Sequence, residues 1–337
     1  MELALQHLQG ERHGREAENL HLHGEEEGAH KGARESPVQR QELDPLAAAF
    51  YTSFSREFAT TVYTSSWPPP RPRTRRAIAI PSSALSPLKE PARTLHAAFL
   101  ARALAIFRVE EVLIYKERGV PCTYLEKILT ALEVPQYLRR YLVPLERTYR
   151  YLGLAPPLAA PSHQLKHENL PLREGIVVKA SRGVAEVYAG LDENIIVEGN
   201  FSAGDRVTLR REGSRWVAAD RDTLDVYWGY RVRSYGSLKE ALERSKGRYL
   251  VVFTSRRGEP LQSVADRLKR DAEAAGGLLL VYGTWDKGVQ EIAEEEGLDL
   301  SAFSPYLVNV AVNQGTRTIR TEEAVLISLS LVNYLLP

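Results

Sequence analysis

One stretch near the end of this chain, residues 313–324 (NQGTRTIRTEEA), constrains the fold more than any other. Residues 306–312 before it are patterned as a strand, and residues 324–336 after it are almost wholly apolar. Gly315 permits a backbone turn that a side chain would hinder. Thr318 stands between two arginines where it can cap a helix, and an acidic pair follows where the helix dipole favours anions. The pattern predicts a strand, a tight cationic turn and a buried helix.

Two interpretations of this turn remain open. Its backbone amides, together with the guanidinium groups of Arg317 and Arg320, are suited to a small polar ligand that carries a phosphate. The alternative is a well-capped buried helix whose arginines are solvated.

The wider segment 314–329 (QGTRTIRTEEAVLISL) resembles the C-terminal motif of the SPOUT RNA methyltransferases. It is most similar to their archaeal and eukaryotic branch of RNA uridine-N3 methyltransferases. Residues 80–107 and 128–144 resemble the N-terminal half of the same branch. The resemblance covers residues 76–337 and implies an α/β fold, a SPOUT-type trefoil-knotted parallel sheet with an inserted small OB-like β-barrel.

The strand and helix pattern is consistent with such a sheet. Buried strands are predicted at 77–80, 109–115, 249–253 and 278–282, and helices at 91–107, 124–132, 238–244, 261–274 and 286–296. Their alternation favours a parallel arrangement. Between them, short β runs punctuated by Gly or Asp suggest a five-stranded barrel, a fold that often binds single-stranded nucleic acid. These runs are residues 176–178, 184–188, 194–197, 206–209 and 215–217.

A chain of 337 residues is long enough for two domains. The segments that we expect are a disordered or extended tail with a Pro/Arg linker at 1–75, a first methyltransferase half at 76–170, the barrel at 171–232, and a second half with the knot at 233–337. Residues 1–45 lack apolar periodicity, which is typical of disorder. The proline-rich residues 68–76 predict an extended segment, whose arginines either contact RNA phosphates or serve a plain linker.

Composition excludes several classes of protein. A single cysteine, Cys122, cannot form an internal disulfide and fits a reducing compartment. No apolar run reaches the roughly 18 residues of a membrane helix, so we expect a cytoplasmic protein. The histidines lack the spacing of a metal site, and no metal is predicted. The net charge of +1 neither requires nor excludes nucleic acid.

The cofactor is predicted from the absence of other binding motifs and from the resemblance to the SPOUT family. The chain has no GxGxxG after a strand, no GxxxxGK and no GxSxG, which argues against a Rossmann site, a P-loop and a common hydrolase. The resemblance implies S-adenosyl-L-methionine held by three loops. The residues it assigns to cofactor binding are Arg257, Gly283, Asn309, Val310, Gln314, Gly315 and Thr318.

The resemblance also suggests reacting and RNA-binding groups. Arg317 and Arg320 are the catalytic candidates, because a cation can stabilise a uridine anion, and Glu322 is a weaker one. Arg102, on the apolar face of the helix 91–107, either reaches phosphate or pairs at an interface. Arginines and tyrosines interleave over 136–151 and suit RNA, with Arg139, Arg140 and Tyr141 as candidates, unless they form an ordinary basic helix face.

We therefore expect a SAM-dependent RNA methyltransferase that acts on a base nitrogen, uridine N3, in ribosomal RNA. SPOUT enzymes are dimers, which implies a homodimer joined through the helix 324–336 and the helix around Arg102. The competing hypothesis is a non-catalytic RNA-binding or ribosome-assembly factor that retains the knotted fold.

Overall fold

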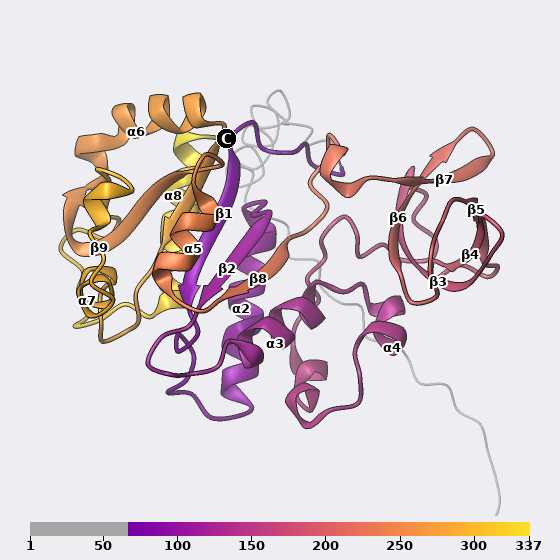
Figure 1. The fold of residues 1–337 in the computed structure, drawn as a ribbon, viewed down its shortest axis with the longest axis horizontal. Helices are drawn as coiled ribbons and strands as arrows, with labels where there is room; N and C mark the ends of the chain where they lie inside the picture. Colours follow the sequence, from indigo (N-terminus) through magenta and orange to yellow (C-terminus); the bar gives the residue numbers. More distant parts are fainter. Residues whose placement is uncertain (1–66) are drawn as a thin grey trace, which may run out of the picture. The chain divides into compact units, whose positions relative to one another are not determined.

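A parallel β-sheet forms the centre of the computed structural model, which describes residues 67–337 (Figure 1). The predicted disordered tail at residues 1–45 lies outside the described residues. The six strands follow the order β11-β9-β10-β1-β2-β8, and every neighbouring pair is parallel. They are β1 (Arg75–Pro81), β2 (Glu111–Tyr115), β8 (Arg231–Tyr235), β9 (Leu250–Pro260), β10 (Gly277–Val281) and β11 (Leu307–Asn309).

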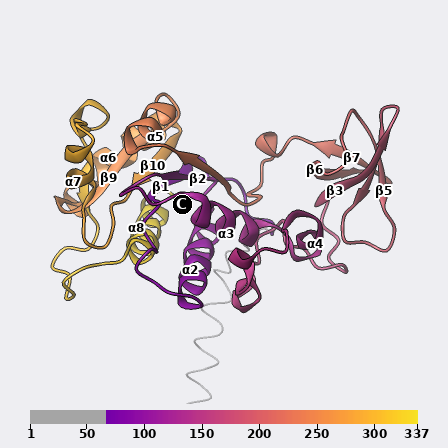
Figure 2. The ribbon, with the colours of Figure 1, turned by 60° about the horizontal axis from the view of Figure 1, so that its bottom comes forward.

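Helices cover both faces of this sheet, because strand residues alternate between two apolar cores. Ile78 and Ile80 of β1 pack on one side with the helices α2 (Ala92–Ile106), α3 (Thr123–Glu133), α6 (Leu261–Ala275) and α8 (Thr321–Leu335). Ala77 and Ala79 pack on the other side with α5 (Leu238–Ser245) and α7 (Val289–Glu295). Figure 2 shows α2, α3 and α8 on one side of the strands and α5 on the other. Strands buried on both faces explain why the sequence shows continuous apolar runs.

Two strands differ from their predicted extent. The strand predicted at 306–312 is only three residues long in β11, because the chain turns away at Val310 toward the loop before α8. β8 was missed altogether, since it is an edge strand with two exposed arginines and no apolar alternation. The C-terminal helix begins at Thr321, so the acidic pair lies in its first turn as predicted, but Thr318 is not its cap. The Glu323 carboxylate instead accepts a hydrogen bond of 2.8 Å from the Arg320 amide.

A separate antiparallel sheet has the order β5-β4-β3-β6-β7 and encloses its own apolar cluster. Its strands are β3 (Leu172–Ser181), β4 (Val184–Tyr188), β5 (Ile195–Glu198), β6 (Arg206–Glu212) and β7 (Arg215–Ala219). Gly175 allows β4 to lie close to β3, because a Cβ there would come within 2.4 Å of a Val187 methyl. Between α3 and β3 the chain forms only short helical turns, namely η2 (Gln136–Leu138), α4 (Arg139–Leu142), η3 (Arg147–Tyr149) and η4 (Leu152–Leu154). The long basic helix considered for 136–151 is therefore absent.

Buried ion pairs tie the antiparallel sheet to α3. Arg206 of β6 lies between Glu133, at the end of α3, and Glu174 of β3, with N–O distances of 2.6 and 2.8 Å. Both carboxylates are almost fully buried, and Arg221 of η5 (Arg221–Thr223) also pairs with Glu133 at 3.0 Å. Burial acts to raise the pKa of Glu133, but the two arginines outweigh it and hold that pKa below its usual value.

The segment 68–76 is not a free linker. The Arg71 amide donates to the Asp225 carbonyl at 2.8 Å, and Pro70 forms a bridge with Val226. Arg76 is buried and donates to the Phe107 carbonyl and to the Asn333 side chain at 2.8 Å each. The chain's own carbonyls and carboxylates engage several of its arginines, because the segment leads directly into the central strand.

Candidate functional site

A cleft of about 190 Å³ opens where β9, β10 and β11 end at the carboxyl edge of the parallel sheet. Ligands of open α/β sheets bind at this edge. Three loops and the start of α8 line the cleft. The lining residues are 254–257 from the first loop, 282–288 with Gln290 and Glu291 from the second, 309–311, 314 and 317–319 from the third, and Thr321 and Ala324 from α8.

The first loop is an irregularity inside β9. Leu307 of β11 pairs with Phe253, but the next residue, Val308, pairs with Glu259, so the residues between them are pushed out of the ladder. Gly258 makes this crossing possible, because a Cβ there would lie 2.6 Å from the Leu307 carbonyl oxygen. The segment TSRRG is thereby presented to the cleft.

The second loop folds tightly on Gly283. A Cβ on this glycine would lie 2.5 Å from the Lys287 carbonyl oxygen and 2.8 Å from the Val289 nitrogen. The loop is closed by a bond of 2.8 Å from the Thr284 amide to the Lys287 carbonyl. The Thr321 hydroxyl donates to the Gly283 carbonyl at 3.1 Å, which connects this loop to α8. Gly283 is therefore required by the loop's own backbone.

The third loop is held to the first by Asn309. Its side-chain amide donates to the Arg256 carbonyl at 2.9 Å, and its oxygen accepts from the Ala311 amide at 2.9 Å. Asn313, with φ of 59°, is the left-handed residue of this turn. The prediction that the turn needs a glycine at position 315 is wrong. The φ of Gly315 is not in the left-handed range, and a Cβ there would meet open space.

The structure brings together most of the residues expected to bind a cofactor. Arg257, Gly283, Asn309, Val310, Gln314 and Thr318 all line the cleft, and Gly315 alone of that set does not. Tyr282, Asp286 and Glu291 line it too. Tyr282 belongs to the segment VYGT that resembles a cofactor loop of the family, whereas no sequence pattern pointed to Asp286 or Glu291. Burial raises the pKa of Tyr282, so its hydroxyl stays protonated and shares a hydrogen bond with Ser328. The helix pattern over 286–296 had suggested only exposed acidic residues.

Both carboxylates at the cleft are engaged. Arg257 pairs with Glu291 at 3.1 Å, and the second Glu291 oxygen accepts from the Gly288 amide at 2.6 Å. Arg118 pairs with Asp286 at 2.9 Å. Burial acts to raise the pKa of Asp286, but hydrogen bonds from Arg118 and Thr284 outweigh it and keep that pKa below its usual value. Within residues 67–337, two of the cations that line the cleft, Arg256 and Arg317, have no carboxylate partner, whereas Arg257 and Lys287 are paired.

The three catalytic candidates occupy different places. Arg317 lines the cleft, whereas Arg320 is exposed and lies outside the lining. Glu322 is buried, and its carboxylate lies 2.6 Å from the His96 imidazole of α2 rather than in the cleft. The catalytic prediction for Glu322 is therefore corrected. Its place on the helix turns it toward α2, which its position in the sequence could not reveal.

Two of the RNA-binding candidates make contacts within the chain. Arg102 donates to the Pro157 and Leu158 carbonyls at 3.2 and 2.8 Å, so it holds the connector 153–161 against α2. Arg139 folds back on the Val134 carbonyl at 3.3 Å, and burial lowers its pKa. These bonds engage one nitrogen of each guanidinium, and the RNA-binding role of both arginines stays a prediction.

Arg140 and Tyr141 do form an exposed aromatic and cationic group, with a third member from elsewhere in the chain. The Arg140 guanidinium carbon lies 4.7 Å from the Tyr141 ring centroid and 4.5 Å from that of Tyr188 in β4. The two rings are 5.2 Å apart. Tyr188 was not predicted, since the strand pattern gave no reason to place it beside α4.

Among the described residues, no cluster of three His, Cys, Asp or Glu side chains is arranged to hold a metal ion. None of the described helices combines the length and apolarity needed to cross a membrane.

Comparison with known proteins decides the family. Residues 75–332 match the family described as "Putative RNA methyltransferase". The chain belongs to this family. The resemblance of residues 314–329 to the SPOUT RNA methyltransferases is thereby confirmed at the level of the family.

Proteins named 28S rRNA (uridine-N(3))-methyltransferase are similar to this RNA methyltransferase family member. The Drosophila melanogaster protein is 32% identical over 305 residues, a match that covers 77% of this chain and 62% of the fly protein. The mouse and human proteins are each 31% identical, covering 75% of this chain and 74% and 76% of their own lengths. The solved structure of the SpoU methyltransferase AviRb from Streptomyces viridochromogenes aligns with 83% of this chain and 78% of its own, at a TM-score of 0.32 and 9% identity.

Proposed function

We propose that this protein is a SAM-dependent methyltransferase that methylates the N3 nitrogen of a uridine in ribosomal RNA. The single observation that carries the proposal is the cleft, in which three loops converge at the carboxyl edge of the sheet. The relatives named for uridine-N3 methylation of 28S rRNA support the substrate. A non-catalytic RNA-binding factor would not require these loops to share one cleft.

The residues present fit a methyl donor with a sulfonium, an amino-acid end and an adenosine. Val310, Ile319 and Ala324 provide apolar surface for a base, and the Arg257 guanidinium stands at the rim for a carboxylate. The backbone of Gly283 lies close to the Lys287 carbonyl, because Gly283 has no side chain to separate them. Calorimetry of the full chain with S-adenosylmethionine should give saturable binding, and the absence of binding would favour an assembly factor.

Arg317 is the residue that we assign to the reaction. S-adenosylmethionine supplies an activated methyl group, so the protein must align the attacking uridine nitrogen with it. That nitrogen gives up its proton to solvent, because the two carboxylates at the cleft are held by arginines, Asp286 by Arg118 and Glu291 by Arg257. The Arg317 guanidinium stabilises the negative charge left on the uracil ring. Arg320, outside the cleft, is placed to contact RNA phosphate.

Replacing these two arginines should therefore have different effects. We expect Arg317→Ala to lower kcat by about 100-fold, the size of effect seen when one charge-stabilising donor is removed from an active site. Arg320→Ala should raise KM for RNA and leave kcat nearly unchanged. Steady-state methyl transfer separates the two, with S-adenosylmethionine affinity as a control. A fall in kcat for Arg320→Ala alone would reverse the assignment.

We propose that the group Arg140, Tyr141 and Tyr188, beside the antiparallel sheet, forms part of the RNA-binding surface. Aromatic rings with an interposed guanidinium offer flat faces on which unpaired bases stack. We also propose the finer features of the fold, namely a trefoil knot formed by the C-terminal segment and an OB-like barrel inserted at 171–232. The strand order β5-β4-β3-β6-β7 supports the barrel.

A homodimer is proposed through α2 and α8, which pack against each other. Large apolar side chains remain uncovered on both helices. Phe99 and Ile106 of α2 are 69% and 54% exposed, and Leu326 and Tyr334 of α8 are 48% and 84% exposed. A second copy would bury them.

We expect Leu326→Glu to convert the dimer to a monomer, because a charge would enter an apolar contact. Leu145→Glu is the matched control, since Leu145 is fully exposed away from these helices. Light scattering on the two variants measures the oligomeric state. If both variants remain dimers, the contact lies elsewhere.

A further inference from the structure

Six arginines converge in a second cavity of about 240 Å³. They come from three parts of the chain that are distant in sequence: the start of β1 and the segment before it, the region from η5 to β8, and the segment before β9. Three carboxylates share the lining. The arginines are Arg71, Arg75, Arg221, Arg231, Arg233 and Arg248, and the carboxylates are Glu110, Glu111 and Asp222.

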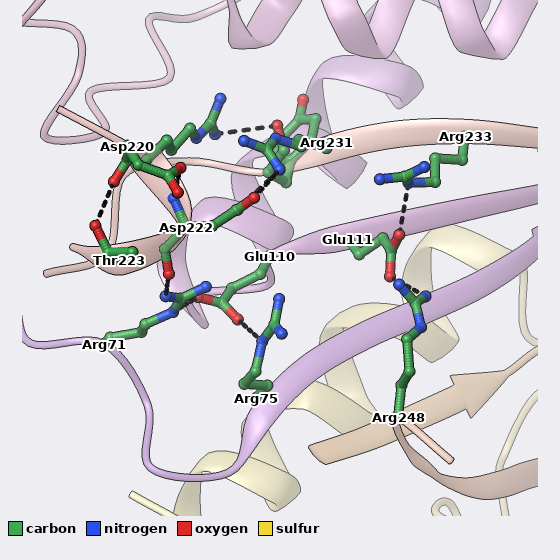
Figure 3. A network of polar contacts seen from close by, with 12 residues as sticks. Arg71, Arg75, Glu110, Glu111, Asp220, Asp222, Thr223, Arg231, Arg233 and Arg248 are labelled. Atoms are coloured by element: carbon green, nitrogen blue, oxygen red, sulfur yellow. Dashed lines mark hydrogen bonds and ion pairs between the residues drawn. The ribbon is translucent and has the colours of Figure 1, made fainter. Parts of the chain in front are cut away.

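Two arginines approach each of the carboxylates Glu110 and Glu111 (Figure 3). Glu110 binds Arg75 at 2.8 Å and also pairs with Arg71. Glu111 binds Arg233 at 2.8 Å and Arg248 at 2.7 Å. The side chains of Glu110 and Glu111 are only 10% and 7% exposed, whereas those of Arg75 and Arg233 are 48% and 53% exposed. The buried carboxylates therefore orient guanidinium groups that face solvent.

The charges in this cavity do not balance. Each buried carboxylate serves two arginines, and Asp222 binds Arg231 through both oxygens at 2.8 Å. Glu133 also pairs with Arg221. When it is included, six arginines face four carboxylates, so two positive charges remain uncompensated. A network built for stability alone would pair charges one to one, because like charges repel. Clustered guanidinium groups held by carboxylates are suited to a phosphate, which they can bind through paired N–H donors.

The position of the cavity separates it from the proposed methyl-transfer cleft. It lies at the amino ends of β1, β2 and β8, whereas the cleft lies at the carboxyl ends of β9, β10 and β11. The seven residues of β1 span roughly 23 Å at about 3.3 Å per residue. A single nucleotide cannot reach across that distance, but a strand of RNA can.

We propose that this arginine cavity binds phosphates of the RNA substrate at a distance from the reacting uridine. The proposal rests on the proposed function for the choice of RNA. It would anchor the RNA by its backbone, without regard to sequence, and leave base selection to the cleft.

The test uses a double variant that keeps every carboxylate paired. In Arg75→Gln/Arg233→Gln, Glu110 retains Arg71 and Glu111 retains Arg248. The matched control is Lys269→Gln/Arg270→Gln, which removes the same charge from exposed positions of α6. Binding of a mixed-sequence single-stranded RNA is measured without methyl donor at several salt concentrations. Losing two phosphate contacts should make the gain in affinity between about 200 and 50 mM salt roughly tenfold smaller for the cavity variant only.

A second measurement uses the unaltered protein. RNA should protect Arg75 and Arg233 from an arginine-modifying dicarbonyl, as mapped by mass spectrometry. Equal salt dependence for wild type, variant and control, or no protection, would overturn the proposal and leave the network a structural one. Protection by inorganic phosphate but not by RNA would also overturn it, in favour of a small anion. Failure of the wild type to bind S-adenosylmethionine would instead count against the proposed function, since RNA binding here needs no methyl donor.

Discussion

Gly283→Val should abolish measurable binding of S-adenosylmethionine. The new Cβ would lie 2.5 Å from the Lys287 carbonyl oxygen and 2.8 Å from the Gly288 carbonyl carbon. Both are backbone atoms of the loop 284–288, so the loop itself must move. Overpacking of this kind costs about 1–3 kcal/mol. That strain alone corresponds to a loss of affinity of roughly 10- to 100-fold, and displacement of the cleft wall adds to it.

The fold should survive this change, because the clash is confined to a surface loop at the cleft. Gly153→Val is the control, since a Cβ on Gly153 meets nothing within 4 Å. Calorimetry gives the affinity and thermal unfolding gives the stability of each variant. Binding of S-adenosylmethionine by Gly283→Val with wild-type affinity would show that the cleft is not the cofactor site.

Arg206→Met should destabilise the protein by about 3–5 kcal/mol, the usual cost of leaving buried charges without their partner. Arg206 holds two carboxylates at once, Glu133 at 2.6 Å and Glu174 at 2.8 Å. Glu174 would keep only the Thr208 hydroxyl and the Trp228 indole, and Glu133 only Arg221 among its charged partners. Arg210→Met is the control on the same strand, because Arg210 is half exposed, and it should change stability by less than about 0.5 kcal/mol.

The effect of Arg206→Met should depend on pH. Because the folded pKa of Glu133 lies below the ordinary value of 4.5, its ion pairs stabilise the fold above that pH. This contribution is lost as the pH falls through the depressed folded pKa. Without Arg206, the buried Glu133 carboxyl has a higher pKa, and the protein is more stable when this carboxyl is protonated. The gap between wild type and variant in urea unfolding should therefore be largest at neutral pH and narrow below pH 4.5. A gap that does not change with pH would mean that lost packing, not charge, accounts for the destabilisation.

The sequence predicted the central strands and most helices well, because strands buried on both faces leave long apolar runs. Residues 77–80 are an example, since Ile78 and Ile80 face one core and Ala77 and Ala79 the other. It failed where tertiary contacts decide the structure. β8 is an edge strand stabilised by pairing with β2, and β11 is short because its neighbour β9 is interrupted.

The candidate site was predicted chiefly by resemblance, which placed loops that no local pattern connects. The structure changes the predictions for individual residues. Gly315 is not the left-handed residue of its turn, and Glu322 contacts His96 instead of lining the cleft. Side chains from separate segments could not be brought together by sequence reasoning. Tyr188 beside Arg140 and the paired arginines around Glu111 depend on strands that meet only in the folded chain.

The most direct test of the central claim is methyl transfer itself. The full chain is incubated with isotopically labelled S-adenosylmethionine and ribosomal RNA, and the digested nucleosides are identified by mass spectrometry. We predict labelled 3-methyluridine at a defined position, with none formed by Gly283→Val. Ribosomal RNA that acquires no label, although the wild-type protein binds it, would contradict the account and leave an RNA-binding factor with an idle cleft.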